Sequence, residues 1–138
     1  MKLFFDTSIL VEIDRHHEHT IEFLKRCTLQ GHELCISTIT VAEILTGTFL
    51  RRDSAIASLI AKEVLNQFSW YDVSGTVAEH AAKISAHLYV NKMQDSVENQ
   101  DILIAATAIN SGADALITLN KKDFVIIPNS RSFSARRV

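Results

Sequence analysis

The chain alternates short hydrophobic runs with longer stretches in which hydrophobic residues recur every three or four positions. The short runs predict strands at residues 2–5, 34–36, 68–71, 115–118 and 125–127. The longer stretches predict helices at residues 8–14, 18–30, from 38 onward, from 53 or 54 onward, 74–91 and 99–110. Short strands separated by helices indicate an α/β fold, with a short parallel sheet that carries helices on both faces. In such sheets ligands bind at the carboxyl ends of the strands.

Polar residues mark the expected starts of two of these helices. Ser37-Thr38 precedes one helix and Asn99 precedes another, and both positions carry side chains that accept a hydrogen bond from the first helical turn. The spacing within the helix at residues 18–30 places three hydrophobic residues on its inner side: Ile21, Leu24 and Leu29.

The composition is that of an ordinary globular domain, since 47% of the 138 residues are hydrophobic and 22% are charged. We expect a single domain over residues 1–138, with a basic tail from about residue 129, after the only proline at Pro128. No apolar stretch approaches the ~20 residues that span a bilayer. Asp6 interrupts the one segment that resembles a signal peptide. These features predict a soluble cytoplasmic protein with no membrane partner.

Three acidic residues stand in hydrophobic surroundings. Asp6 follows the first strand directly, Glu43 lies within a hydrophobic helix, and Asp101 falls in the first turn of another helix. A charge in such surroundings costs free energy unless a proton, a cation or hydrogen bonds compensate it. Taken singly, each acid has an ordinary explanation as a turn, cap or solvated helix residue. Their expected convergence on one edge of the sheet favours a shared site.

Carboxylates that converge in this way repel one another. Three of them within ~5 Å of one another repel by several kcal/mol at intermediate dielectric. Either some of them stay protonated at neutral pH, or a cation lies between them. The candidate ligands are oxygen atoms, and neither cysteine nor histidine is required. This donor set favours Mg²⁺, for which Mn²⁺ can substitute, over zinc.

Four segments of the sequence stand in the order and at the separations typical of a known family. They are Phe5–Leu10, Ile39–Gly47, Asp101–Ala108 and Ile117–Phe124. On these segments the chain resembles the PIN-domain proteins and is most similar to the VapC-type toxins of VapBC toxin–antitoxin pairs. The resemblance covers almost the whole chain and implies a PIN-like α/β fold.

The resemblance also implies an activity and partners. It implies a Mg²⁺-dependent endoribonuclease that cuts RNA by in-line attack of a metal-activated water, leaving 5′-phosphate and 3′-hydroxyl ends. Proteins of this kind are often homodimers. A cognate VapB-like antitoxin encoded beside the toxin inhibits it, in an assembly that contains both chains.

Carried over to this sequence, the family pattern assigns roles to individual residues. Asp6 and Asp101 become the principal metal ligands. Glu43 becomes the third catalytic acid, which binds the metal directly or through water. Thr7 is expected to contact Asp6 without binding the metal itself and to orient its carboxylate.

The fourth acidic position departs from the common pattern. Many PIN domains carry an acid where this chain has Asn120, whereas members with the pattern T-x-N-x-x-D-F have it at the position of Asp123. We therefore expect Asp123 to be the fourth catalytic acid and Asn120 to contact water or phosphate. Glu98 is either a further acid near the metal or a charge at a helix start.

Three other functions fit the sequence less well. A phospho-acceptor receiver domain carries paired acids after its first strand, but Thr7 follows Asp6 here, and Asp72 stands alone as the acceptor. A haloacid-dehalogenase-type phosphatase has a second aspartate where this chain has Ser8. A non-catalytic PIN-like domain that binds RNA or acts as a scaffold remains the main alternative, and the three acids argue against it.

Overall fold

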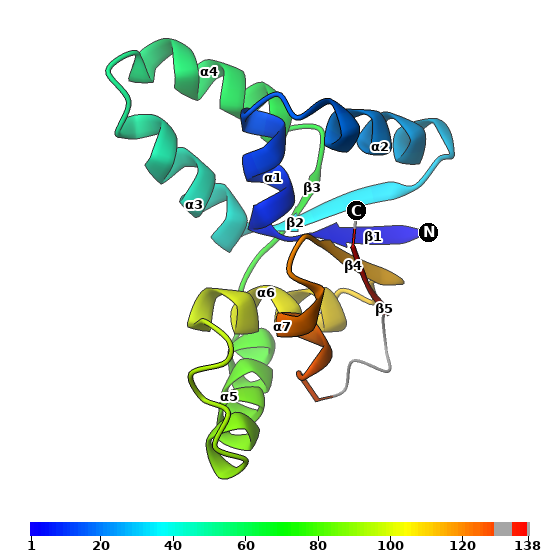
Figure 1. Ribbon diagram of the computed structural model, residues 1–138, viewed down its shortest axis with the longest axis vertical. Coiled ribbons are helices and arrows are strands. Elements are labelled where there is room, and N and C mark those ends of the chain that lie inside the picture. The colour runs from blue at the N-terminus through cyan, green and yellow to red at the C-terminus, as the bar shows by residue number, and fades with distance from the viewer. Residues whose placement is uncertain (129–133, 138) are drawn as a thin grey trace.

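The computed structural model describes residues 1–128 and 134–137 (Figure 1). The strands are β1 Lys2–Phe5, β2 Glu33–Ser37, β3 Ser69–Tyr71, β4 Ala115–Thr118 and β5 Ser134–Arg137. The helices are α1 Thr7–Asp14, α2 Glu18–Leu29, α3 Thr38–Phe49, α4 Ser54–Leu65, α5 Gly75–Val90, α6 Asn99–Asn110 and α7 Lys121–Val125. Most of these elements lie within two residues of the predicted ones.

The described strands form one sheet in the order β3-β2-β1-β4-β5, and every neighbouring pair is parallel. Strand β1 lies at the centre, with β2 and β3 on one side and β4 and β5 on the other. The chain therefore leaves β1 toward one side of the sheet and later returns to the other side. Ligands bind at such a reversal in an α/β sheet, outside the carboxyl ends of the strands.

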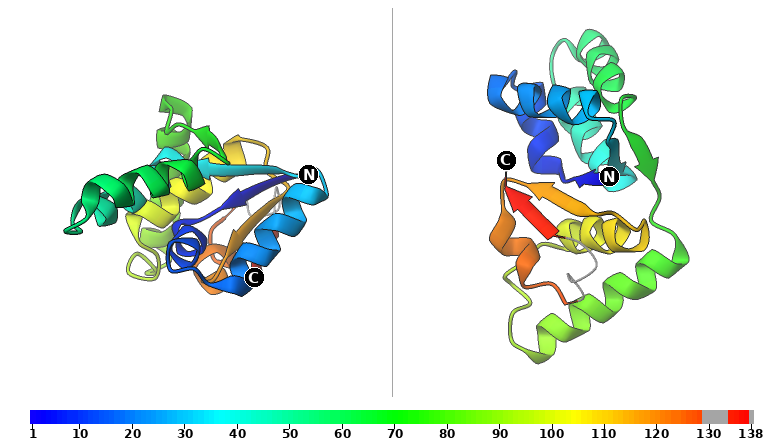
Figure 2. Two further views of the ribbon diagram at one scale, coloured as in Figure 1. Left: turned by 90° about the horizontal axis from the view of Figure 1, so that it is seen from above. Right: turned by 90° about the vertical axis from the view of Figure 1, so that its right-hand side faces the viewer.

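Separate hydrophobic cores cover the two faces of the sheet. Phe4 belongs to one core, with residues of α5, α6 and α7, whereas its neighbours Leu3 and Phe5 belong to the other core, with residues of α1 to α4. This alternation follows from the opposite orientation of successive side chains along a strand. Figure 2 shows α5 to α7 on one side of the sheet and α1 to α4 on the other. The predicted parallel sheet with helices on both faces is confirmed.

The C-terminal part of the chain differs from the prediction. Residues 125–127 do not form a strand, because Phe124 and Ile127 are buried at a helical spacing while Val125 is 49% exposed at the end of α7. The last strand is instead β5, which pairs with β4. This part of the expected basic tail thus belongs to the sheet, and residues 129–133 of that tail lie outside the described residues.

Two details of the helices also differ from the prediction. Leu29 is 86% exposed because it lies at the end of α2, whose buried residues are Thr20 and Cys27. Glu98, rather than Asn99, occupies the N-cap position of α6, and no side chain caps that helix. Within the described part of the chain, no helix is both long enough and apolar enough to cross a membrane.

Candidate active site

The central strand delivers Asp6 to the carboxyl edge of the sheet. The backbone N–H of Asp6 donates a hydrogen bond of 3.2 Å to the carbonyl oxygen of Ile117, which continues the pairing of β1 with β4 by one residue. The side chain of Asp6 caps α1 and accepts a hydrogen bond of 3.4 Å from the backbone N–H of Ile9. Strand and helix together hold this carboxylate, which is only 2% exposed.

Two hydroxyl groups complete the surroundings of Asp6. Ser8 donates a hydrogen bond of 2.5 Å to Oδ1, and Thr118 donates one of 2.5 Å to Oδ2. Burial raises the pKa of Asp6 above its ordinary value, and the hydrogen bonds from Ser8, Thr118 and the backbone oppose this rise. The sequence-based expectation that Thr7 orients Asp6 is therefore corrected, because Ser8 and Thr118 contact its carboxylate.

Thr7 holds Glu43 instead. Its Oγ1 donates a hydrogen bond of 2.8 Å to Oε1 of Glu43 and lies 3.0 Å from Oγ1 of Thr40. Glu43 lies in α3, which begins where the side chain of Ser37 accepts a hydrogen bond from the backbone N–H of Ile39, as the sequence predicts. The end of β1 thus positions Asp6 directly and Glu43 through the hydroxyl group of Thr7.

Asp101 lies in the first turn of α6 and lines the same pocket as Asp6. Burial, together with the negative charges of nearby acids, raises the pKa of Asp101 to about 6, and burial has the largest effect. In order of decreasing effect, these neighbours are Asp6, Glu98, Asp123 and Glu43. The predicted acids are therefore close enough to act on one another, and a cation between them would relieve their repulsion.

The pocket has a volume of about 420 Å³ and contains most of the predicted site. The predicted residues that line it are Asp6, Thr7, Asp101, Asn120 and Asp123. Glu98, which the sequence left open, lines it as well and also stands at the N-cap of α6. Glu43 is absent from the lining and adjoins it through its hydrogen bond to Thr7.

Several residues near the pocket were not foreseen as part of the site. Asp95 and Ser96 line it from the turn that precedes α6, where no hydrophobic pattern marks a functional position. Ser8 also lines it, and only its position two residues after Asp6 could have indicated a role in the site. Thr118 begins the T-x-N-x-x-D-F pattern, but it lies 112 residues from Asp6, so the sequence does not link the two.

The donor set of the pocket fits Mg²⁺. Five carboxylates line it, and no lysine or arginine is found among the described residues of the lining. Over residues 1–128 and 134–137, no three histidine, cysteine or acidic side chains lie close enough together to hold an ion directly. Mg²⁺ does not require such a cage, because it usually keeps several waters and binds one or two carboxylates. Asp6 and Asp101 suit this mode of binding best.

The family model of the PIN domain matches residues 3–128, which is most of the chain. The chain belongs to the PIN-domain family. Over 124 residues this PIN domain is 27% identical to Ribonuclease VapC2 of Haemophilus influenzae, and the match covers 90% of each protein. A second relative with the same identity and coverage is Ribonuclease VapC of another strain of that species.

Solved structures share the fold of this PIN domain. One is VapBC2 from Rickettsia felis bound to a DNA fragment from its promoter, with a TM-score of 0.86, 22% identity and coverage of 100% of this chain and 99% of that one. Another is DNA-bound VapBC from Salmonella typhimurium, with a TM-score of 0.83, 23% identity and coverage of 99% and 98%. The expected PIN-like fold is confirmed.

Proposed function

We propose that this PIN domain is a metal-dependent endoribonuclease and the toxin of a type II toxin–antitoxin pair. The observation that carries the proposal is that Asp6 and Asp101, which are distant in sequence, line one acidic pocket at the carboxyl edge of the sheet. The similarity to VapC ribonucleases supports the same activity and an RNA substrate. The wholly acidic charge of the lining supports a divalent cation as the cofactor.

The acidic side chains of the site have separate roles in RNA hydrolysis. Asp6 and Asp101 bind Mg²⁺, or Mn²⁺ in its place. When bound, the metal supplies activation of water and compensation of the negative charge on the phosphate. Glu43, which Thr7 holds in place, and Asp123 would orient the attacking water, and one of these two carboxylates would accept its proton.

Asn120 has a separate role beside these acids. It lines the pocket with an exposed side chain, so its amide is able to donate a hydrogen bond to a phosphate oxygen or a water. The expected products carry 5′-phosphate and 3′-hydroxyl ends.

Incubation of the purified chain with a mixed RNA pool tests this proposal. We expect cleavage with Mg²⁺ and with Mn²⁺, loss of cleavage in EDTA, and recovery when excess Mg²⁺ is restored. Labelling of the product ends identifies the 5′-phosphate. RNA binding without EDTA-sensitive cleavage would instead support the non-catalytic PIN-like scaffold.

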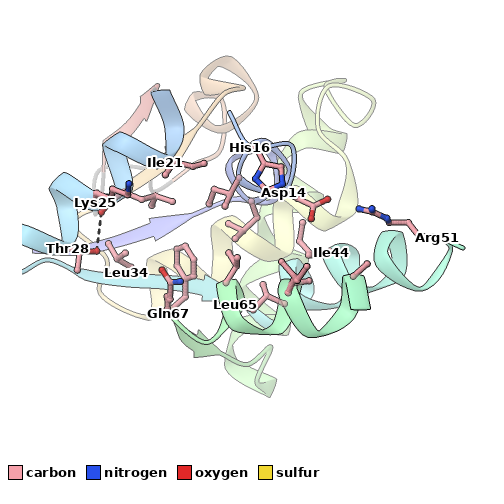
Figure 3. A pocket seen from close by; sticks show the side chains of 18 of the residues that line it. Asp14, His16, Ile21, Lys25, Thr28, Leu34, Ile44, Arg51, Leu65 and Gln67 are labelled. Carbon is pink, nitrogen blue, oxygen red and sulfur yellow. Dashed lines mark hydrogen bonds between the residues drawn. The ribbon is translucent and has the colours of Figure 1, made fainter. Parts of the chain in front are cut away.

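An apolar groove supports an antitoxin as the protein partner. The groove has a volume of about 700 Å³ and lies between α1, α2 and α4. Its hydrophobic lining includes Ile21 and Leu24 of α2 and Ile60 of α4. Figure 3 shows Lys25 and Arg51 at its opposite ends.

Large exposed apolar grooves mark partner sites, and the solved structures that share this fold include VapBC complexes and a toxin–antitoxin complex. We therefore assign this groove to a hydrophobic segment of a VapB-like antitoxin. We also propose a homodimer of the toxin, which joins the antitoxin in a larger assembly. Light scattering of the purified chain, with and without the antitoxin, tests both assemblies.

A further inference from the structure

The hydrogen bonds around Asp6 form a network in which the donor and the acceptor of each bond can be assigned. We propose that Ser8 and Thr118 are positioning residues that orient the Asp6 carboxylate and leave one acceptor site of Oδ2 open for the metal. This inference rests on the proposed function, because it takes Asp6 to be a metal ligand.

A backbone amide orients each of the two hydroxyl groups. The N–H of Leu119 donates a hydrogen bond of 3.1 Å to Oγ of Ser8, and the N–H of Asn120 donates one of 2.8 Å to Oγ1 of Thr118. Each hydroxyl thus accepts from an amide and has a single proton of its own to donate. Since the Asp6 oxygens lie 2.5 Å away, both protons are directed to that carboxylate.

The acceptor sites of Asp6 are unequally occupied. Oδ1 accepts hydrogen bonds from Ser8 and from the backbone of Ile9, whereas Oδ2 accepts one from Thr118. A carboxylate offers about four acceptor sites, two on each oxygen. Oδ1 is therefore saturated, and Oδ2 keeps one site. Oδ2 is accordingly the oxygen through which Asp6 would bind the metal or a water on the metal.

The same network ties a second part of the pocket to Asp6. Asn120 lines the pocket and stands directly before α7, which carries Asp123. Its backbone bonds to Thr118, which is 0% exposed, and through Thr118 to Asp6. Loss of the Thr118 hydroxyl removes one hydrogen-bond partner from the backbone N–H of Asn120 and one from the Asp6 carboxylate. Little water can reach this place to replace it.

The test compares hydroxyl removal with hydroxyl retention in the folded, full-length protein. Thr118→Val keeps the shape of the side chain and loses the hydroxyl, whereas Thr118→Ser keeps the hydroxyl. Mn²⁺ affinity is measured by calorimetry and electron paramagnetic resonance. We expect Thr118→Val and Ser8→Ala to weaken Mn²⁺ binding about 10- to 100-fold, as loss of an outer-shell partner does, and Thr118→Ser to stay within about threefold.

Thr48→Val is the matched control. Thr48 is also a buried threonine, but its hydroxyl donates to the carbonyl oxygen of Ile44 within α3, so its loss should leave Mn²⁺ affinity unchanged. If Thr118→Val does not fold, Ser8→Ala carries the test, because Ser8 is only half-buried.

The outcomes separate this inference from the proposed function. A wild-type protein that binds no Mn²⁺ overturns the proposed function. Wild-type affinity in the folded hydroxyl-free variant, or equal weakening in Thr118→Val and Thr118→Ser, overturns the positioning role alone.

Discussion

The hydroxyl of Thr7 donates a hydrogen bond of 2.8 Å to Oε1 of Glu43 and so joins the end of β1 to α3. Because the single proton of Thr7 is used in this bond, the contact of 3.0 Å with Thr40 requires the Thr40 hydroxyl to donate to Thr7. Thr40 is fully buried, and its position is set by the packing of α3. Glu43, although exposed, is therefore held by two successive hydroxyl groups.

Replacement of Thr7 should lower the rate of cleavage through Glu43. We expect Thr7→Val to reduce kcat about tenfold, because the carboxylate loses the donor that orients it, and to leave KM nearly unchanged. Steady-state cleavage of a fluorogenic RNA measures both constants. Thr7→Ser keeps the donor and should retain most of the activity, so equal losses in the two variants would contradict this role.

Asp101→Asn should abolish RNA cleavage. We expect the rate of cleavage to fall at least about 100-fold, because the amide cannot supply the negative charge that binds the metal. This exceeds the effect of losing an outer-shell partner. Circular dichroism checks that the variant is folded. Asp72→Asn alters an exposed acid that does not line the pocket and should cleave normally. Mg²⁺-dependent cleavage by folded Asp101→Asn would count against the assigned site.

The same substitution should stabilise the metal-free protein at neutral pH. The pKa of Asp101 is about 6 in the folded protein, against 3.8 as its ordinary value. Asp101 thus binds its proton more tightly in the folded state than in the unfolded state. The stability that this proton gives the folded state is fully present below about pH 4 and is lost as the pH rises through 6.

This linkage can be measured by thermal unfolding in EDTA. After screening by solvent is allowed for, we expect Asp101→Asn to gain about 1 kcal/mol at pH 8 and much less at pH 4. An equal effect at both pH values would contradict the linkage to Asp101.

Metal affinity should fall as the pH decreases through 6. Protons and the metal compete for the Asp101 carboxylate, whose pKa is about 6. Displacement of one proton predicts that Mn²⁺ affinity weakens about tenfold for each pH unit below 6. Titration calorimetry at pH 5 and pH 7 measures the change. In Asp101→Asn any residual binding should lose this part of the pH dependence.

A charge in the apolar groove should weaken antitoxin binding and spare catalysis. Ile60 lines the groove, whereas Leu59, its neighbour in α4, does not. We expect Ile60→Asp to weaken binding at least about tenfold, because it places a charge against apolar side chains. Leu59→Asp is the control for an added charge on an exposed position of α4. Equal weakening of antitoxin binding in both variants would argue for another site.

The success of the sequence-based predictions depended on how local each feature is. The buried side of α5 follows the helical period and consists of Val77, Ala81, Ile84 and Leu88, so its spacing alone identified it. The run at residues 125–127 is equally hydrophobic, yet Val125 lies in α7, because β5 occupies the edge of the sheet beside β4. A hydrophobic run does not specify its partner.

The sequence alone predicted the order of the elements as far as β4 and the α/β architecture, and it proposed Asp6, Glu43 and Asp101 as a shared site, because hydrophobic period and out-of-pattern charges are local properties. Only the tertiary structure decided which hydroxyl holds which acid. Thr7 and Ser8 are adjacent, but they point to different carboxylates, and Thr118 reaches Asp6 across 112 residues. Such contacts depend on the direction in which each strand ends and on which strands lie side by side, and the pairing of β1 with β4 sets both.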